Sequence, residues 1–430
     1  MSGTASLRVL LVTNAYAPSP AIGGRRMEHL AAGLHARGHD VTVLTVTEAT
    51  LPSVDRRLQP PPGPRVIRAP AVHWRDLVAK LPGAARAPET ASDSIAGPAA
   101  TRPRRTTKAR LKGAVRAAGQ LALSPLRDPD DWAGWILPAY LRGLSERADV
   151  VIATCPNASN FRAGARLART IGARFVLDYR DPLSSLWRRR DDVWMPVVPA
   201  SRVARRERRW WQQADACVGV TPTISAWLAE DGAPNVHEIA NGARLEALQT
   251  PAVPTATDGP VVLLYGGSLS YGRDLRPVMR AIAQRDGVVL RYLGPHGDVF
   301  MDMARDVGVV DRVQERGLVD RTTAQAEAAT AHANLVVVSP AYDYAYPGKI
   351  FDLASAGARQ WLLAPADAAA TTLYARHGLG LASDGLDVAE DLRVLDRVIA
   401  GDWPERRDLQ ALSIDTMVER YERLLRSVCA

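Results

Sequence analysis

Short apolar runs alternate with amphipathic stretches along most of the chain. An apolar run at residues 8–14 is followed at residues 26–37 by a segment whose leucines and alanines recur at helical spacing. Gly38 ends this segment, and a second apolar run follows at residues 40–45. A strand, a helix and a strand in this order predict two parallel strands joined by a right-handed crossover.

The same alternation continues beyond this opening unit. Further strands are expected at residues 150–154, 174–179, 216–220, 261–265, 288–293 and 335–338. Buried apolar runs separated by helices are typical of parallel sheets that are covered on both faces. The pattern therefore predicts an α/β protein with two doubly wound halves, each with a ligand site at the carboxyl ends of its strands.

Two segments break the alternation and suggest domain limits. Residues 51–107 contain proline clusters and weak periodicity, which predicts a mobile insertion, and residues 248–260 have the composition of an exposed linker. We therefore expect an N-terminal domain at residues 1–247 and a C-terminal domain at residues 261–404. Residues 405–430 should form a C-terminal helix, and one alternative is that it packs back on the first domain.

The composition fits a two-domain cytoplasmic protein. The chain has 430 residues, of which 47% are hydrophobic, so it can bury more core than one domain normally holds. Cys155, Cys217 and Cys429 lie far apart, match no metal-ligand spacing and form no disulfide framework. The amino terminus resembles no export signal, and no apolar stretch reaches membrane-spanning length. We expect a protein that is neither exported nor integral to a membrane.

The net charge of +8 comes from arginine in clusters. These clusters lie at residues 102–116, 187–190 and 205–211. Arginine beside tryptophan suits nucleic acid or the head-group layer of an anionic membrane, and solvated helix faces have the same composition. Together the clusters favour an anionic surface or acceptor, without nucleic acid, and leave open peripheral contact with the inner face of the cell membrane.

A helix near residue 350 carries the most informative pattern in the chain. Pro347 and Gly348 open this helix after a predicted strand, and Lys349 follows. A helix start with a glycine lets a diphosphate approach backbone amides, and the helix dipole attracts anions. Asp352, one turn further on, is placed to accept hydrogen bonds from ribose hydroxyls. An ordinary amphipathic helix with Ile350 in the core explains the same residues.

Glycine loops follow the first strand of each half. Gly23 and Gly24 precede the first helix, and Gly267 and Ser268 follow the strand at residues 261–265. Such loops allow a phosphate or sugar to approach the backbone closely. Neither loop is the Gly-x-Gly-x-x-Gly fingerprint, which disfavours a dehydrogenase.

Arg273 is the cation nearest the second glycine loop in sequence. A guanidinium at the start of the following helix would pair with a diphosphate leaving group and stabilise its growing charge. Arg273 could instead pair with Asp274 or Asp302 at the surface.

Two similar halves with these loops resemble the GT-B glycosyltransferases, which have two Rossmann-like domains facing across a cleft. More narrowly, the chain resembles the family-4-type retaining enzymes, which transfer a sugar from a nucleotide diphosphate donor. The resemblance covers nearly the whole length, and its segments are residues 23–24, 38–41, 241–242 and 347–352. The last segment, Pro-Gly-Lys-Ile-Phe-Asp, is similar to the family's Pro-Ser-Lys-Leu-Phe-Glu, whose acid binds the ribose.

The resemblance implies roles for particular residues. It implies catalytic roles for Arg273, Lys349 and Asp181. It implies donor binding by Gly23, Gly24, Gly267, Ser268, Arg273, Gly348, Lys349, Ile350 and Asp352. In such an enzyme the departing phosphate takes the acceptor's proton, so electrostatic stabilisation of the diphosphate carries the catalysis. No metal or other cofactor is implied.

The chain departs from the family pattern at two places. Tyr344 stands where the family has the first of two glutamates, and no histidine follows the strand that ends before Cys155. A subgroup without that histidine, resembling aminodeoxyhexose transferases of bacterial surface polysaccharides, has an Arg-Asp-Pro-Trp element, and this chain has Arg-Asp-Pro at residues 180–182. Asp181 would contact a sugar hydroxyl or cap the following turn. Asp178 is a weaker candidate.

These residues favour a glycosyltransferase that acts on a membrane-associated glycan or lipid, or on a secondary-metabolite acceptor. Two alternatives remain, a nucleotide-sugar epimerase of the same architecture and a non-catalytic nucleotide-sugar-binding protein. The Asp-x-Asp at Asp128 and Asp130 superficially resembles the motif of metal-dependent transferases, but it does not follow a strand, so we assign no metal site.

Overall fold

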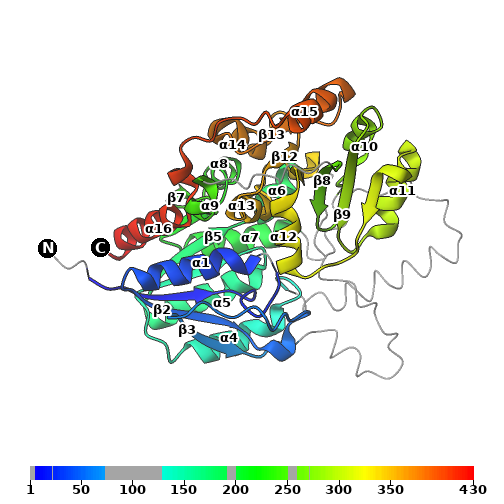
Figure 1. The fold of residues 1–430 in the computed structure, drawn as a ribbon. Coiled ribbons are helices and arrows are strands. Elements are labelled where there is room, and N and C mark those ends of the chain that lie inside the picture. The colour runs from blue at the N-terminus through cyan, green and yellow to red at the C-terminus, as the bar shows by residue number, and fades with distance from the viewer. Residues whose placement is uncertain (1–4, 22, 73–127, 191–199, 250–258, 271) are drawn as a thin grey trace, which may run out of the picture. The chain divides into compact units, whose positions relative to one another are not determined.

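The computed structural model describes residues 5–21, 23–72, 128–190, 200–249, 259–270 and 272–430. The chain divides into two compact units. Unit 1 comprises Met1–Ala240 and Met417–Ala430, and unit 2 comprises Asn241–Thr416. Each unit contains a sheet with helices packed on it (Figure 1). Most of the expected insertion and linker, and the basic cluster at residues 102–116, lie outside the described residues.

The described part of unit 1 contains a seven-stranded sheet in the order β3-β2-β1-β4-β5-β6-β7. Its strands are β1 (Arg8–Val12), β2 (Asp40–Val46), β3 (Arg65–Ala69), β4 (Val150–Thr154), β5 (Arg174–Tyr179), β6 (Ala216–Gly219) and β7 (Val236–Glu238). Its helices are α1 (Gly23–Ala36), α4 (Ile136–Gly143), α5 (Ala158–Ile171), α6 (Leu183–Arg189), α7 (Ala200–Trp211), α8 (Pro222–Glu230) and α16 (Ile414–Cys429). All pairings among these strands are parallel.

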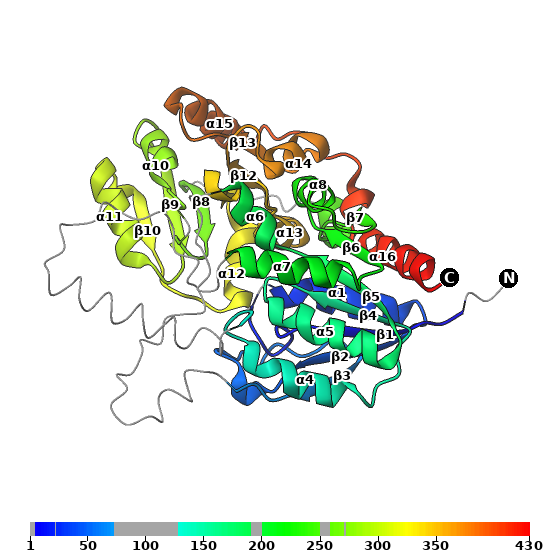
Figure 2. The same cartoon turned by 180° about the vertical axis from the view of Figure 1, so that it is seen from behind.

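The strand order of unit 1 reverses between β1 and β4, which is the topological switch point of the sheet. Val9 of β1 pairs with Val41 of β2 on one side and with Val150 of β4 on the other. Helices α4 and α5 pack together on one face of this sheet, and α1 covers the opposite face (Figure 2). Because both faces are covered, these central strands are buried almost completely.

The described part of unit 2 contains a six-stranded parallel sheet in the order β10-β9-β8-β11-β12-β13. Its strands are β8 (Val261–Gly266), β9 (Val288–Leu293), β10 (Val313–Glu315), β11 (Ala333–Val337), β12 (Gln360–Leu363) and β13 (Leu381–Ser383). Its helices are α9 (Leu245–Gln249), α10 (Arg276–Ile282), α11 (Gly297–Val307), α12 (Arg321–Thr330), α13 (Gly348–Ser355), α14 (Ala369–His377) and α15 (Val388–Ala400). Here the order reverses between β8 and β11.

The side-chain alternation of β11 builds two separate cores in unit 2. Leu335 and Val337 join the cluster that contains residues of α10, α11 and α15. Val336 and the following Val338 join the cluster on the other face, with residues of α13 and α14. The apolar run at residues 335–338 therefore holds helices on both faces, as a doubly wound sheet requires.

Five strands that the sequence did not predict complete the two sheets. They are β3, β7, β10, β12 and β13, each of three to five residues. Strand β3 lies within residues 51–107, for which we expected a mobile insertion. That expectation is wrong for residues 65–69, which pair in register with β2. Their Arg-Val-Ile-Arg-Ala pattern is short and adjoins a proline cluster, so it gave no clear strand signal.

A buried ion pair holds the last helix against the first sheet. The guanidinium of Arg26 on α1 lies 3.0 Å from the carboxylate of Asp178 at the end of β5, and their side chains are 2% and 0% exposed. The hydroxyl of Tyr421 on α16 donates to the same carboxylate and accepts from Arg26. The hydroxyl of Thr154 also donates to Asp178, at 2.7 Å. Asp178, the weaker candidate for sugar contact, is thus a structural residue.

Candidate active site

The glycine loop of unit 2 lies at the switch point, directly after β8. Gly267 has a φ of +125°, and a Cβ atom there would lie 3.2 Å from Nζ of Lys349. The carbonyl oxygen of Ser268 accepts hydrogen bonds from the hydroxyl of Tyr265, at 2.8 Å, and from Nη1 of Arg273, at 3.2 Å. The loop therefore brings Arg273 and Lys349 to one place at the carboxyl edge of the sheet.

Helix α13 supplies Lys349 from the other side of the switch point. The helix follows β11, the neighbour of β8 in the sheet. Nζ of Lys349 lies 4.0 Å from the centroid of the Tyr265 ring, a cation–π distance. Asp352 lies one turn later on the same helix face. Its carboxylate is close enough for its charge to act on the Lys349 ammonium.

The ammonium of Lys349 is electrostatically poorly compensated. Burial of the ammonium, together with the smaller effect of the positive charge of Arg273, lowers the pKa of Lys349 from 10.5 to about 7, whereas Asp352 acts in the opposite direction. The residue keeps part of its surface exposed, so a ligand can reach it. Two cations held side by side at a glycine loop favour the binding of an anion between them.

Three details of the predicted site differ in the structure. Arg273 does not begin a helix, because α10 starts at Arg276, with Pro277 at its first turn. Pro347 is the N-cap residue of α13 and not its first helical residue. Ile350 was predicted to bind the donor, but its side chain is buried in the core and its N–H donates to the carbonyl of Pro347. Ile350 is therefore not available to a ligand here.

Asp274 and Asp302, the alternative ion-pair partners proposed for Arg273, form ion pairs with other arginines. Asp274 pairs with Arg276 at 3.2 Å, and Asp302 pairs with Arg305 on the same helix. Both carboxylates are thus held by other arginines, and the Arg273 side chain contacts the glycine loop instead.

In unit 1, the glycine pair lies at the start of α1, next to the Arg-Asp-Pro element. A Cβ atom on Gly23 would lie 2.3 Å from Nη1 of Arg180, and one on Gly24 would lie 3.0 Å from the carbonyl oxygen of Ala15. A side chain at position 23 would displace the Arg180 guanidinium, and one at position 24 would press on the backbone of the preceding loop. Because Gly23 has no side chain, the Arg180 guanidinium lies against the first turn of α1.

Asp181 lies at the carboxyl end of β5, beside the switch point of the first sheet. The backbone amides of Arg180 and Asp181 donate to Sγ of Cys155, at 3.2 and 3.3 Å, which fixes the turn. Burial raises the pKa of Asp181, and Arg180 partly offsets this effect. Helix α6 begins at Leu183, with no side-chain cap, so Asp181 does not serve as its N-cap. Leu183 has a φ of +29°, a strained conformation that marks this turn.

Comparison with known families identifies the chain. The sequence profile described as the glycosyl transferase 4-like domain matches residues 23–242, just over half of the 430 residues. The chain belongs to this family. The match begins at the Gly23–Gly24 pair and ends after Asn241. A search of curated proteins gives no sequence match.

Solved structures show that this family member has the GT-B fold. Sucrose-phosphate synthase from Thermosynechococcus elongatus superposes with a TM-score of 0.65 at 16% identity, covering 98% of this chain and 99% of that one. The Anabaena protein HepE in complex with UDP and glucose gives 0.57 at 12% identity, with coverage of 98% and 100%. A glycosyltransferase involved in avilamycin A biosynthesis gives 0.51 at 14% identity, with 98% of both chains covered. The two doubly wound units predicted from the sequence are therefore confirmed.

The structure also shows contacts that the sequence did not predict. Tyr265, the last large residue of β8, lies under Lys349 and supports the loop carbonyl of Ser268. Nδ1 of His296 accepts from the N–H of Leu269 at 3.2 Å, which fixes the same loop. Both residues end or follow strands at the carboxyl edge, and that position was the available signal. The neighbour of Asp181, Arg180, had been noted as part of a motif without a role.

Two of the basic clusters are packed differently from the expectation of a membrane surface. Arg188 and Arg189 both pair with Asp231, at 2.8 and 3.0 Å. Trp210 and Trp211 are each 5% exposed and lie in the core rather than at a lipid boundary. Arginines 205, 208 and 209 remain exposed on α7. No helix within the described ranges is long and apolar enough to cross a bilayer.

The acidic pair near residue 130 has a structural role. Asp130 accepts hydrogen bonds from the backbone N–H and the hydroxyl of Ser159 and from the N–H of Trp132. Asp128 forms an ion pair with Arg206 of α7. These carboxylates fasten a loop to α5 and α7, and no cluster of three metal-binding side chains occurs in the described part of the chain.

Tyr344, in place of the family's first glutamate, is 2% exposed.

Proposed function

We propose that this glycosyl transferase 4-like protein transfers a sugar from a nucleotide diphosphate donor bound at the switch point of unit 2. The observation that carries the proposal is the convergence of Arg273 and Lys349 on the loop at Gly267 and Ser268. A diphosphate is the group that this arrangement suits, because it supplies two negative charges to two adjacent cations. The UDP and glucose in the HepE complex support a donor of this chemical class.

Gly267, Gly348 and Asp352 of unit 2 are assigned to the diphosphate and the ribose of the donor. We infer that the diphosphate lies against Gly267 and Gly348, where a side chain would obstruct its approach. Asp352, one turn from the start of α13, then accepts hydrogen bonds from the ribose. The charge of the leaving diphosphate grows as the bond between the anomeric carbon and the phosphate oxygen breaks, so Arg273 and Lys349 contribute most in the transition state. The proposal needs no metal.

The reaction in this proposal proceeds with retention. The acceptor hydroxyl attacks the anomeric carbon on the face that the diphosphate leaves, and its proton passes to the departing phosphate oxygen. A protein base is then unnecessary. Asp181, together with Gly23 and Gly24 of unit 1, would contact sugar hydroxyls of the donor or the acceptor. The Arg-Asp-Pro element supports an acceptor of the surface-polysaccharide type, and a secondary metabolite is the second acceptor class.

The proposal also includes contact of helix α7 with a membrane surface. The exposed arginines of α7, at positions 205, 208 and 209, offer a face for anionic lipids without a tryptophan anchor. Replacing all three with glutamine should reduce sedimentation with phosphatidylglycerol vesicles. Unchanged sedimentation would assign them to a solvated helix face.

The function is tested with purified protein and a panel of nucleotide diphosphate sugars. Mass spectrometry should detect release of the nucleoside diphosphate with one or a few donors, and transfer when lipid or glycan acceptors are added. Isomerisation of the donor sugar would instead establish an epimerase. Binding without hydrolysis, transfer or isomerisation would establish a non-catalytic binding protein. Arg393→Gln, an exposed change on α15, serves as the control for the active-site variants.

A further inference from the structure

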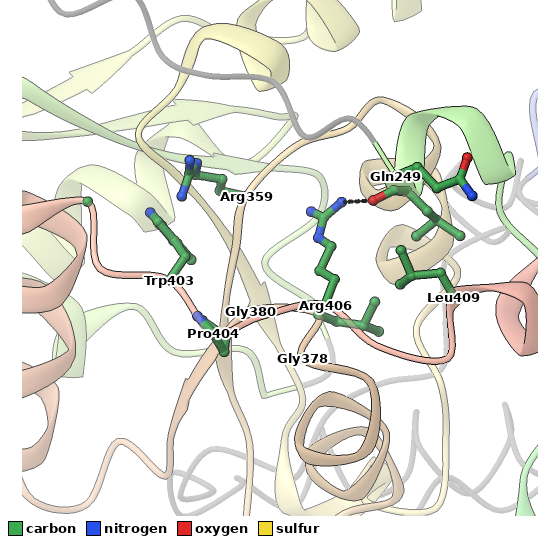
Figure 3. A pocket seen from close by; sticks show the side chains of 11 residues that line it. Gln249, Arg359, Gly378, Gly380, Trp403, Pro404, Arg406 and Leu409 are labelled. Atoms are coloured by element: carbon green, nitrogen blue, oxygen red, sulfur yellow. Dashed lines mark hydrogen bonds between the residues drawn. The ribbon is translucent and has the colours of Figure 1, made fainter.

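Unit 2 has a cavity at the edge of its sheet opposite to the glycine loop. Arg359 directly precedes β12 and Gly380 directly precedes β13, so the cavity lies at the amino ends of these parallel strands. The glycine loop after β8 lies at the carboxyl edge. The cavity has a volume of about 520 Å³, and Figure 3 shows Arg359, Trp403 and Arg406 gathered around it. It is therefore separate from the proposed donor site.

Two partly buried guanidinium groups give this cavity its chemistry. Nε of Arg359 is buried and has no hydrogen-bond partner in the described part of the chain, while its Cζ lies 5.2 Å from the centroid of the Trp403 ring. Arg406 donates to the carbonyl oxygens of Leu248, at 2.8 Å, and Ala358, at 3.3 Å. Burial lowers the pKa of both arginines, and the charge of Arg359 lowers that of Arg406 further.

The carboxylates on the neighbouring segment leave these two charges uncompensated. Asp402 pairs with Arg397 of α15 at 2.7 Å, and Asp408 lies 4.0 Å from His377. Glu405 is exposed to solvent. Two cations that are partly desolvated and lack an acidic partner among the described residues raise the free energy of the empty cavity, and an anion would remove this cost.

We propose that this cavity binds a phosphomonoester that carries a small organic group. Two planar guanidinium groups match a phosphate dianion in charge and in hydrogen-bond geometry. A ligand with a single carboxylate would balance their charge and satisfy their N–H donors less completely. The volume exceeds what a phosphate alone fills, and Leu379 and Leu409 provide apolar lining for the attached group. The ring of Trp403 lies beside Arg359, where it fixes the guanidinium and offers an edge to the ligand.

The proposal is tested by calorimetry with three probes, which are glucose 6-phosphate, inorganic phosphate and glucose. The phosphomonoester should bind most tightly, phosphate more weakly, and glucose not at all. Arg359→Gln should lower the affinity for the phosphomonoester by about 10-fold or more. Arg273→Gln at the donor loop and the exposed Arg393→Gln should bind it as the unaltered protein does.

A second measurement separates a binding role from a structural one. Nε of Arg359 has no hydrogen-bond partner within the described residues, and the charge of Arg359 opposes that of Arg406, so Arg359→Gln should leave the melting temperature of the ligand-free protein unchanged or raise it. The rise in melting temperature caused by glucose 6-phosphate should be lost in the same variant. The proposal is wrong if neither phosphate probe binds at millimolar concentration, if Arg359→Gln binds as well as the unaltered protein, or if Arg273→Gln abolishes binding.

Discussion

The proposed donor site predicts that nucleotide-sugar affinity falls as the pH rises above 7. In the ligand-free protein, burial and Arg273 lower the pKa of Lys349 from 10.5 to about 7. A bound diphosphate supplies the missing negative charge and raises this pKa again, so binding takes up a proton. The bound state then holds more protons than the free state above pH 7, and affinity must decrease with pH in that range.

The size of the effect follows from the titration of one lysine. With a pKa of about 7, the charged fraction of Lys349 falls from roughly 90% at pH 6 to roughly 1% at pH 9, which sets an upper limit of about 90-fold on the loss of affinity. Lys349 is partly exposed, and solvent screening reduces the coupling. We therefore expect a loss of at least about 10-fold, equivalent to ~1.4 kcal/mol.

Isothermal titration calorimetry at pH 6, 7, 8 and 9 measures this dependence directly. The diphosphate of a nucleotide sugar keeps a constant charge over the range, and buffers of different ionisation enthalpy report the proton uptake. Lys349→Arg stays charged and should bind with nearly constant affinity, whereas Lys349→Met should bind weakly at every pH. His296→Gln removes a histidine that contacts the loop and should keep the wild-type slope. A flat wild-type profile, or the same slope in Lys349→Met, would refute the reasoning.

The lowered pKa of Lys349 also predicts how the stability of the ligand-free protein depends on pH. Its folded-state pKa lies below that of the unfolded chain, so the unfolded state binds more protons between about pH 7 and 10.5. The contribution of this group to stability therefore rises with pH across that window. Lys349→Met should raise the melting temperature at neutral pH while weakening donor binding. A lower melting temperature would show that the lysine stabilises the fold.

Three substitutions test other parts of the structure. Asp352→Ala should weaken donor binding by about 1 to 3 kcal/mol in calorimetry, because a ribose hydrogen bond is lost. Arg273→Ala should lower turnover more than donor affinity in steady-state kinetics, because its charge acts on the leaving group. Asp178→Ala should lower the free energy of unfolding in urea by about 3 to 5 kcal/mol, because the buried Arg26 guanidinium loses its carboxylate partner.

Each of these three predictions would be contradicted by a particular result. Unchanged donor affinity in a folded Asp352→Ala protein removes its ribose role, and equal losses of affinity and turnover in Arg273→Ala, or no loss of either, would contradict a role on the leaving group. For Asp178→Ala the matched control is Glu419→Ala, which breaks an exposed pair on α16 whose side chains are 73% and 53% exposed. That control should cost less than about 1 kcal/mol. Similar costs for both variants would exclude a special role for the buried pair.

The sequence predicted the central strands of both sheets because their apolar runs are long and are buried on both faces. The strands at residues 174–179 and 288–293 were predicted with their actual bounds. Strands β10 and β13 have three residues each, which is too short for a periodic signal. They are strands because they pair with β9 and β12. Their conformation is a consequence of tertiary context.

The candidate site shows the same division between local and tertiary information. The glycine loop and the helix start at Gly348 were readable from local spacing. The contact of Lys349 with Tyr265, and the repulsion between Lys349 and Arg273, depend on neighbouring strands that are distant in sequence. Ile350 was assigned to the ligand because it stands inside a motif. Helical periodicity places it in the core, and here the periodicity was the better guide.

The network around Asp178 also determines when unit 1 can be completed during synthesis. Arg26 and Asp178 are 152 residues apart, and Tyr421 follows Asp178 by 243 residues. At roughly 5 to 20 residues per second, the ribosome needs about 12 to 50 seconds to supply the last helix after Asp178 has emerged. Until then, the surface of α1 that packs on Val418 remains exposed. Nascent chains of this protein therefore carry an apolar surface that chaperones can bind, and unit 1 matures only after α16 has been synthesised.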